Sequence, residues 1–318
     1  MIEQMEAMLK EVKSISRKKG LKTGITIAET QNQNNPKTFF PPLRYAEGIA
    51  IANVITSDKS DVIEICKVID GNLDFIFVDN ENKKINLLDI VTTHINKSNI
   101  NTFRPNDMTV DAADALIIKK FSSLDGKNIL IMGAGNIGSK LALKLVERGA
   151  DIFIYRRDFL KCSVIADGLN NIKSSGVNST ITPIKTIRNI DFSKIDILIG
   201  STSGYPVIKK KHLMYIKDNA YILDVGIGNL DCEAIEFGLS RGIELIRLDM
   251  RAGFTSQIAL NRETDLLVEK VMGEKVSNGG KRFVAGGKIG KKNDVIVDNI
   301  TNPSEEIGIA DGRGGLIR

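Results

Sequence analysis

The sequence predicts an α/β protein whose second half forms a parallel, doubly wound sheet. Short apolar runs alternate with stretches of helical periodicity along most of the chain, as parallel strands joined by crossover helices require. A glycine-rich turn at residues 133–138 follows one such run and opens a helix. The length of 318 residues suits two domains, because single hydrophobic cores usually stop growing below this size.

Helices and strands alternate in the first half. Residues 2–18 carry apolar side chains at helical spacing and predict a core-facing helix. The polar, proline-containing segment 31–44 predicts a long loop, and such loops often carry function. Residues 43–55 are compatible with either a helix or a strand. The other expected elements are strands at 24–28 and 74–79 and helices at 61–69, 85–95 and 110–121.

The second half repeats the alternation with more regular spacing. The expected strands lie at residues 128–132, 151–155, 195–200, 220–226 and 243–249. The expected helices lie at residues 138–149, 159–170, 209–216, 231–242 and 255–272. Beyond residue 272 the chain is rich in Gly, Lys and Asp and contains two short apolar runs. This end is expected to form an extension without a recognised mechanism.

Composition excludes several classes of protein. The formal charge of +5 arises from 44 basic and 39 acidic residues, which is too balanced to indicate nucleic-acid binding. Cys66, Cys162 and Cys232 are scattered singly and are expected to be reduced, buried thiols. His94 and His212 lack neighbouring ligands at metal spacing, so we expect no metal site. Without a signal peptide or a spanning apolar stretch, the protein is expected to be cytoplasmic and free of the membrane.

The motif GxGxxG falls on Gly133, Gly135 and Gly138, directly after a predicted strand. The first glycine permits a tight turn, the second lets main-chain amides approach a pyrophosphate, and the third allows close packing of helix on strand. Asn136 and Ile137 open the helix, whose N-terminus favours phosphate. The pattern predicts a Rossmann dinucleotide-binding site, with a ligand-free glycine turn as the alternative.

The end of the next strand indicates which dinucleotide binds. Arg156 and Arg157 stand where an acidic residue would contact the ribose of NAD, and guanidinium groups there suit the 2′-phosphate of NADP. Asp158 argues for NAD, although its position also fits an N-cap of the following helix. We therefore predict NADP, with NAD as the alternative.

Two later strand ends should complete the pocket, because ligands of such sheets lie at the carboxyl ends of the strands. One strand runs into Ser201 and Thr202, and another ends at Gly226. Small and hydroxyl-bearing residues at these places would let a nicotinamide lie against the main chain. Ordinary small-residue turns are the alternative.

The stretch from Gly133 to Cys162 resembles the nucleotide domain of shikimate dehydrogenases and glutamyl-tRNA reductases. Residues 106–170 also resemble methylene-tetrahydrofolate and methylene-tetrahydropterin dehydrogenases. The resemblance covers roughly residues 105–250. It implies an α/β substrate domain at 1–115, a Rossmann domain at 116–252, and a C-terminal segment at 253–318 that comprises a helix packing back across the cleft and the glycine-rich extension.

The same resemblance suggests site residues. Asn53 and Lys59 have the separation of the shikimate dehydrogenase motif that contains the catalytic lysine, and Asn106-Asp107 falls where its aspartate would lie. Lys59 and Asp107 are thus candidates for proton transfer, with Asn106 beside the substrate. Lys59 could equally be an exposed turn lysine. Asp107 could cap the following helix, in which case Asp111 competes for its role.

Gln257 resembles a family glutamine that reaches into the cleft from the C-terminal helix, and Arg251 and Arg262 could bind a substrate carboxylate or simply lie on the surface. The serine motif of shikimate dehydrogenases and the catalytic cysteine of glutamyl-tRNA reductases are missing from the sequence. The resemblance therefore implies an NADP-dependent oxidoreductase acting on a small, carboxylated alcohol, ketone or imine. We also expect the chain to form a homo-oligomer, such as a dimer. The alternatives are a methylene-tetrahydrofolate or methanopterin-type dehydrogenase and a nucleotide sensor or scaffold without catalysis.

Overall fold

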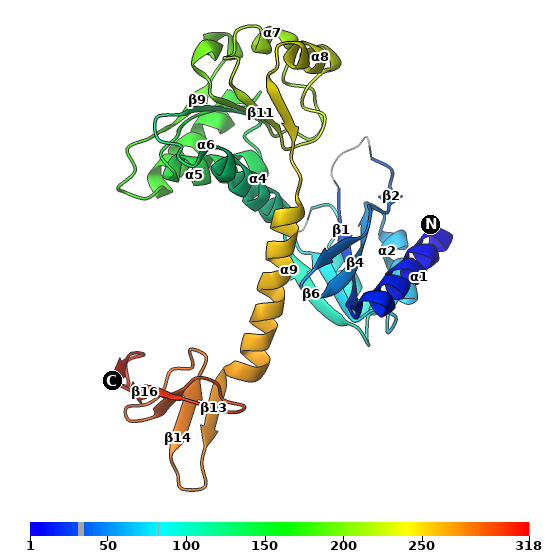
Figure 1. Ribbon diagram of the computed structural model, residues 1–318, viewed down its shortest axis with the longest axis vertical. Coiled ribbons are helices and arrows are strands. Elements are labelled where there is room, and N and C mark those ends of the chain that lie inside the picture. Colours follow the sequence, from blue (N-terminus) through cyan, green and yellow to red (C-terminus); the bar gives the residue numbers. More distant parts are fainter. Residues whose placement is uncertain (31–34, 82, 318) are drawn as a thin grey trace. The chain divides into compact units, whose positions relative to one another are not determined.

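The computed structural model describes residues 1–30, 35–81 and 83–317. The chain divides into two compact units, Met1–Gln257 and Ile258–Arg318. Helix α9 (Arg251–Leu266) runs across the division (Figure 1). The larger unit contains two sheets, and its mixture of helices with parallel strands confirms the α/β fold class.

The first sheet has the strand order β2-β4-β1-β5-β6, with β3 paired to β4. β1, β4, β5 and β6 are mutually parallel where they pair, whereas β2 and β3 are antiparallel to β4. The strands are β1 (Lys22–Ala28), β2 (Thr38–Phe39), β3 (Arg44–Ala46), β4 (Ile49–Thr56), β5 (Phe75–Asp79) and β6 (Asn99–Phe103). The helices of this half are α1 (Ile2–Lys19), α2 (Lys59–Ile69), α3 (Leu87–His94) and α4 (Pro105–Phe121).

The structure resolves the ambiguity at residues 43–55 in favour of strands, since β3 and β4 form a hairpin there. Within the segment expected to be a loop, only β2 and the first residue of β3 are strand; residues 31–34 lie outside the described part, and the rest is irregular as expected. β6 was not predicted from the sequence because NINTF has only two apolar residues among five and no regular alternation. Helix α4 begins at Pro105, earlier than expected, with proline in the first turn where its missing N–H costs nothing.

The second sheet has the order β12-β11-β10-β7-β8-β9, and every pairing in it is parallel. This is the strand order of a dinucleotide-binding sheet, which reverses between β7 and β10. The strands are β7 (Asn128–Met132), β8 (Asp151–Tyr155), β9 (Ile181–Ile184), β10 (Ile197–Gly200), β11 (Tyr221–Asp224) and β12 (Glu244–Arg247). The helices are α5 (Asn136–Glu147), α6 (Phe159–Ile172), α7 (Lys210–Leu213) and α8 (Cys232–Ser240), with short 3₁₀ turns η1 (Ile187–Asn189) and η2 (Phe192–Lys194).

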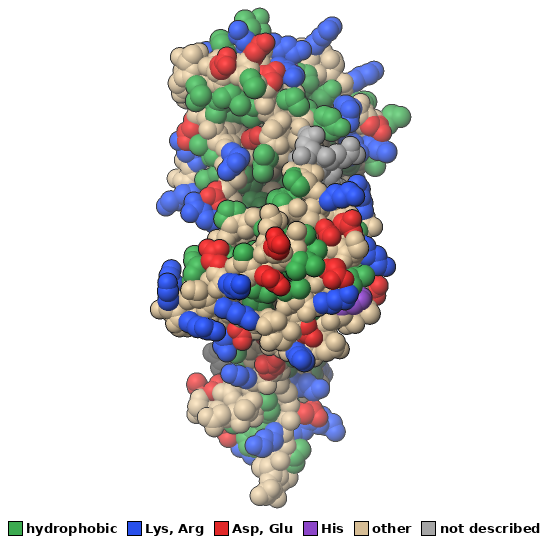
Figure 2. Space-filling view, turned by 90° about the vertical axis from the view of Figure 1, so that its right-hand side faces the viewer, with side chains coloured by type: hydrophobic (Ala, Val, Ile, Leu, Met, Phe, Trp, Pro, Cys, Tyr) green, Lys and Arg blue, Asp and Glu red, His purple; other side chains and the backbone are tan. Residues whose placement is uncertain are grey.

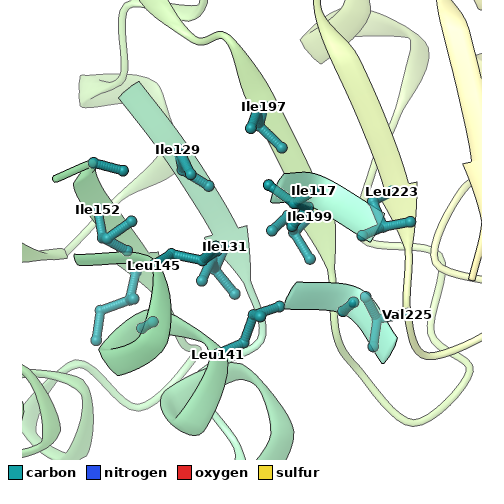
Figure 3. Close-up of a cluster of buried hydrophobic side chains, with 14 of the residues drawn as sticks. Ile117, Ile129, Ile131, Leu141, Leu145, Ile152, Ile197, Ile199, Leu223 and Val225 are labelled. Carbon is teal, nitrogen blue, oxygen red and sulfur yellow. The ribbon is translucent and has the colours of Figure 1, made fainter. Parts of the chain in front are cut away.

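Alternate residues of each central strand enter separate cores on the two faces of this sheet. Ile129 and Ile131 of β7 pack with side chains from α4 and α5 on one face (Figure 3). Leu130 and Met132 of the same strand pack on the other face with η2, α7 and α8. Burial on both faces explains why these strands read as continuous apolar runs in the sequence. β9 was missed because Pro183 interrupts it, which an edge strand tolerates.

The smaller unit contains a five-stranded sheet where only an extension was expected. The π-helical turn η3 (Leu267–Val271) leads into β13 (Gly273–Val276), β14 (Arg282–Ala285), β15 (Val295–Val297), β16 (Glu306–Ala310) and β17 (Leu316–Ile317). Its small core includes Ala285, Val295 and Val297. Strands of two to five residues separated by glycine turns carry too little periodicity to be recognised in the sequence.

The surface and the cysteines add three observations. On the face drawn in Figure 2, basic and acidic side chains are interspersed, in keeping with the balanced charge. Cys66 and Cys162 are buried as expected, but Cys232 is exposed at the start of α8, which corrects that expectation. Among the described residues, no helix combines the length and the apolar character needed to cross a membrane.

Candidate functional site

Two of the three motif glycines are required by packing alone. Gly133 has φ 127°, and a Cβ there would lie 2.5 Å from the carbonyl oxygen of Ser201. A Cβ on Gly138 would lie 2.0 Å from the carbonyl oxygen of Gly133. β7 and β10 are neighbours, so the turn after β7 must pass directly beside the residues that follow β10. No side chain can be accommodated at either position without moving the main chain.

Gly135 differs from the other two, because no atom lies within 4 Å of the Cβ it lacks. Its backbone is extended (φ −96°, ψ −162°), and α5 begins at the next residue. Among the described residues, no side chain caps the N-terminus of α5. Open space in front of uncapped amides and the positive end of a helix dipole is the environment that a pyrophosphate occupies. The residues present therefore fit a dinucleotide.

A cavity of about 530 Å³ opens along this turn and the end of β8. Arg156 lines it and donates from Nη1 to the carbonyl oxygen of Ala134 at 2.8 Å. Arg157 also lines it, with its guanidinium carbon 5.6 Å from the centroid of the Tyr205 ring. Asp158 accepts from the main-chain N–H of Lys161 at 3.1 Å, so its predicted role as the N-cap of α6 is confirmed. The guanidinium groups of Arg156 and Arg157 thus line this cavity, while the carboxylate of Asp158 caps the N-terminus of α6.

The strand ends expected to complete the pocket converge on the same turn. Ser201 Oγ donates to the carbonyl oxygen of Gly133 at 2.7 Å. Thr202 donates from its main-chain N–H and from Oγ1 to Asn229 Oδ1, at 2.8 and 2.6 Å. Gly226 lies close to Thr202, because a Cβ added to Gly226 would be 2.0 Å from the carbonyl oxygen of Thr202. These contacts join the residues after β10 to those after β11.

The residue that organises this junction was not singled out in the sequence. Asn229 is fully buried, and its Nδ2 donates to Asp224 Oδ1 at 2.8 Å. Asp224 also accepts the main-chain N–H groups of Gly228 and Asn229 through Oδ2. A buried polar side chain costs free energy unless it is hydrogen-bonded, so this satisfied network specifies one arrangement of the two loops. The sequence signal for it was an asparagine five residues beyond the end of the buried strand β11 (Tyr221–Asp224).

A second cavity, of about 370 Å³, lies at the carboxyl ends of β1, β5 and β6 in the first sheet. Its wall includes residues of the first sheet together with part of the glycine-rich turn. Gly135, Ser201, Thr202 and Ser203 line both cavities. A ligand extended along the turn would therefore pass from the arginine-lined cavity into this one.

The charged centre of the second cavity is Lys83, whose side chain is only 11% exposed. Its Nζ lies 2.5 Å from Asp79 Oδ2 and 3.2 Å from Glu81 Oε2, and donates to the carbonyl oxygen of Glu29 at 3.1 Å. Glu81 Oε2 accepts no hydrogen bond from a described residue, so the lysine is its nearest charge partner. Glu29, which also lines the cavity, accepts main-chain N–H groups of Lys84 and Ile85. This cluster combines a buried amine, which can carry a proton, with buried carboxylates.

Of the site residues that the resemblance suggested, some line the second cavity and others lie outside both cavities. Asn106 lines the second cavity, and its main-chain N–H donates to Glu81 Oε1 at 2.9 Å. Lys59 is exposed in the first turn of α2 and lines neither cavity. Asp107 also lines neither; it lies in the first turn of α4, ion-paired with Lys140 and with Arg104. Asp107 therefore does not cap α4, because the helix begins before it.

Other candidates lie apart from the cavities. Asp111 pairs with Lys144 at 3.1 Å, and the largely exposed Arg251 pairs with Asp249 at 2.6 Å. Gln257 belongs to α9 and lines neither cavity, and Arg262 lies in the smaller unit, 3.7 Å from Asp265. In the part of the chain that the structure describes, no three His, Cys, Asp or Glu residues are grouped to hold a metal ion.

Comparison with known proteins supports the reading of the nucleotide domain. Residues 115–237 match the family model described as shikimate / quinate 5-dehydrogenase. A glutamyl-tRNA reductase of Methanosphaera stadtmanae is 28% identical over 130 residues, covering 40% of this chain and 28% of that protein. A 2-dehydropantoate 2-reductase of Pyrococcus abyssi is 30% identical over 113 residues, covering 35% of this chain and 36% of that protein. The chain thus spans about a third or less of the length of these relatives.

Two solved structures are similar as well. A shikimate dehydrogenase in complex with NADP+ is 11% identical, with a TM-score of 0.45, covering 76% of this chain and 96% of that one. The quinate dehydrogenase of Corynebacterium glutamicum in complex with NAD is 14% identical, with a TM-score of 0.43, covering 77% of this chain and 92% of that one. The stretch matched by the family model contains the glycine-rich turn, Arg156 and β10. Over part of its length, the chain is thus similar in sequence to shikimate / quinate dehydrogenases and to glutamyl-tRNA reductases.

Proposed function

We propose that the protein is an oxidoreductase that uses a nicotinamide dinucleotide to reduce or oxidise a small molecule in the second cavity. The observation that carries this proposal is the lining shared by the two cavities, which joins the dinucleotide cradle to the Lys83 cluster. The family match and the free space at Gly135 support the dinucleotide. The cluster supplies what a carbonyl or alcohol substrate needs, a positioned acid or base.

The preferred cofactor is NADP(H), with NAD(H) as the alternative. Arg156 is held by the carbonyl of Ala134, and Arg157 extends beside Tyr205, so both guanidinium groups border the same cavity. Planar guanidinium groups bind a 2′-phosphate through paired, charge-assisted hydrogen bonds. When bound, the nicotinamide supplies or accepts the hydride.

Lys83 is assigned the proton transfer that accompanies hydride transfer. In the reducing direction its ammonium group donates a proton to the oxygen that gains negative charge, and the neutral amine is reprotonated from solvent. Asp79 and Glu81 orient Nζ through the two ion pairs. Asn106 lies in the same cavity wall and is assigned a hydrogen bond to the substrate. In the oxidising direction the same groups act in reverse.

The cofactor assignment is tested by titrating the protein with NADPH and, separately, with NADH while following nucleotide fluorescence. We expect tighter binding of NADPH, and Arg156→Ala should remove that preference. Arg247→Ala is the matched control. It removes the same charge, but Arg247 is exposed at the end of β12 and lines neither cavity. Absence of binding of both nucleotides contradicts the proposal.

A screen of candidate substrates that follows NADPH absorbance then distinguishes an enzyme from a nucleotide sensor without catalysis. Nucleotide binding that is never followed by an absorbance change would favour a nucleotide sensor. Turnover with a carbonyl substrate that Lys83→Met abolishes would support the oxidoreductase. Turnover that survives this substitution would favour chemistry of the methylene-tetrahydrofolate type, which needs little acid or base from the protein. The homo-oligomeric state stays a prediction.

A further inference from the structure

Helix α6 carries apolar side chains on the face that it turns away from the nucleotide-binding sheet. Its inner face, which includes the buried Cys162 and Ala166, packs against β8 and β9. Leu160, Val164 and Ile172 lie on the outer face and are 78%, 71% and 65% exposed. A helix at the surface of a soluble protein normally presents polar and charged residues on its outer face. An apolar row in this place therefore needs an explanation.

The row is continuous along the helix. Leu160, Val164, Gly168 and Ile172 follow one another at intervals of four residues, and residues four apart are neighbours on a helix surface. We call these four residues the α6 stripe. Because they share one face, they form a single contact surface instead of isolated exposed side chains.

Gly168, in the middle of the stripe, points to a close neighbour. Glycine in the interior of a helix is less favourable than alanine, so its presence there calls for a steric reason. Gly238 of α8 has one within the chain, since a Cβ there would lie 3.0 Å from the side chain of Leu245. At Gly168, no atom of the described residues lies within 4 Å of the missing Cβ. The chain itself does not require this glycine, whereas the close approach of another helix would.

The spacing of the stripe matches the stripe of a second copy. Residues 160, 164, 168 and 172 are placed symmetrically about residue 166, so two α6 helices can pack antiparallel about a twofold axis level with Ala166. Val164 then lies level with Gly168 of the partner subunit, where the missing side chain leaves room for it. Leu160 lies level with Ile172 of the partner subunit. A surface that fits its own copy in this way makes the isologous contact of a twofold dimer. We propose that the α6 stripe is a dimer interface and that its occupant is the α6 stripe of a second copy of this chain.

The charge of α6 permits this contact. The helix contains one cation, Lys161, and one anion, Asp167, so two copies of it bring no net charge of the same sign together. The size of the helix sets the strength of the contact. A helix of 14 residues is about 21 Å long, and a pair of such helices buries an area at the low end for specific interfaces. The dimer should accordingly dissociate in the micromolar range.

The test is sedimentation velocity of the full chain at protein concentrations from about 1 µM to about 200 µM. Wild-type protein is expected to shift from monomer to dimer within this range. Val164→Lys should weaken dimerisation at least tenfold, because it places a charge at the centre of the contact. Gly168→Gln should do the same by filling the gap, although it favours the helix. Leu239→Lys is the matched control, since Leu239 is a similarly exposed apolar residue on α8, and this variant should dimerise like wild type.

A mixing experiment tests the antiparallel arrangement. Leu160→Glu and Ile172→Lys should each weaken dimerisation when studied alone. An equimolar mixture of the two variants should regain the dimer, because the arrangement places the introduced carboxylate beside the introduced ammonium group and leaves the second contact apolar.

Three results would overturn the proposal. A wild-type chain that stays monomeric throughout the concentration range would assign the stripe to a different protein. A dimer that Val164→Lys and Gly168→Gln leave intact would lie on another surface. A mixture of Leu160→Glu and Ile172→Lys that stays monomeric would exclude the antiparallel pairing. Thermal unfolding of each variant establishes that it is folded, and Gly168→Gln provides the answer if Val164→Lys is not.

Discussion

Gly135→Ala should weaken dinucleotide binding strongly without harming the fold. The backbone at Gly135 is extended and suits alanine, and no atom lies within 4 Å of the added Cβ. Replacing glycine at such a position stabilises a protein by about 0.4–1 kcal/mol, because the unfolded chain loses conformational freedom. The added methyl group instead occupies the space into which a pyrophosphate must come to reach the first amides of α5.

The loss of affinity can be estimated from the hydrogen bonds that the methyl group prevents. A hydrogen bond to a charged group contributes about 1.5–3 kcal/mol, so losing one weakens binding roughly 10- to 100-fold. Gly138→Ala is the matched comparison. Its Cβ would lie 2.0 Å from the carbonyl oxygen of Gly133, so the main chain must shift, at a cost of about 1–3 kcal/mol.

The two variants are compared by urea unfolding and by titration with NADPH. Gly135→Ala should unfold at the same urea concentration as wild type or a higher one, and bind NADPH poorly. Gly138→Ala should be impaired in both measurements. The reasoning is refuted if Gly135→Ala binds NADPH like wild type, or if it is destabilised as much as Gly138→Ala.

Three further predictions concern stability and reactivity. Arg148→Ala removes the two 2.7 Å hydrogen bonds to the buried Asp114 and should lower the free energy of unfolding by roughly 1–3 kcal/mol; Lys144→Ala, which breaks an exposed pair, should change it little. Burial lowers the pKa of His212 to about 4, so its contribution to stability is complete above pH 6.5 and is lost as the pH falls toward 4. Between pH 6.5 and 4, the free energy of unfolding measured with urea should fall by roughly 2–3 kcal/mol less in His212→Asn than in wild type. A thiol reagent at pH 8 should modify only Cys232 in the folded protein, since burial raises the pKa of Cys66 to about 11 and that of Cys162 above its ordinary value.

Each of these has an outcome that contradicts it. Equal stability of Arg148→Ala and wild type would mean that Asp114 finds another partner or water. An unchanged pH dependence in His212→Asn would mean that the imidazole, which accepts the main-chain N–H of Lys209 at 3.0 Å, is protonated in the folded protein as easily as in the unfolded one. Rapid modification of more than one thiol would mean that the domain opens readily.

The nucleotide domain was the most predictable part of the fold. Its central strands are buried on both faces, so each appears as an uninterrupted apolar run, and each helix between them has a clear apolar face. β6 and β9 carry polar residues or proline and give no such signal. The sheet of the smaller unit depends on pairings between strands of a few residues, which are set by tertiary contacts rather than by local pattern.

The candidate site likewise has one part that the sequence predicts and another that it does not. The spacing of the glycines could be predicted because it belongs to one continuous turn, in which a Cβ on Gly138 would meet the carbonyl oxygen of Gly133. Arg44 and Lys83 meet in one cavity only through the order of strands in the first sheet, which the sequence does not display. The rule that ligands lie at carboxyl strand ends could have drawn attention to Lys83, four residues after β5. Nothing comparable points to Arg44.

The dinucleotide cradle consists largely of main-chain groups, whereas the second cavity presents side chains from the first sheet. Substitutions change side chains and leave amides and carbonyls in place. Substrate preference can therefore drift by exchange of residues such as Arg44 or Asn106 while cofactor use persists. A library randomised only at the strand ends of the first sheet should accordingly yield variants with new substrates that all retain the parent's nucleotide affinity.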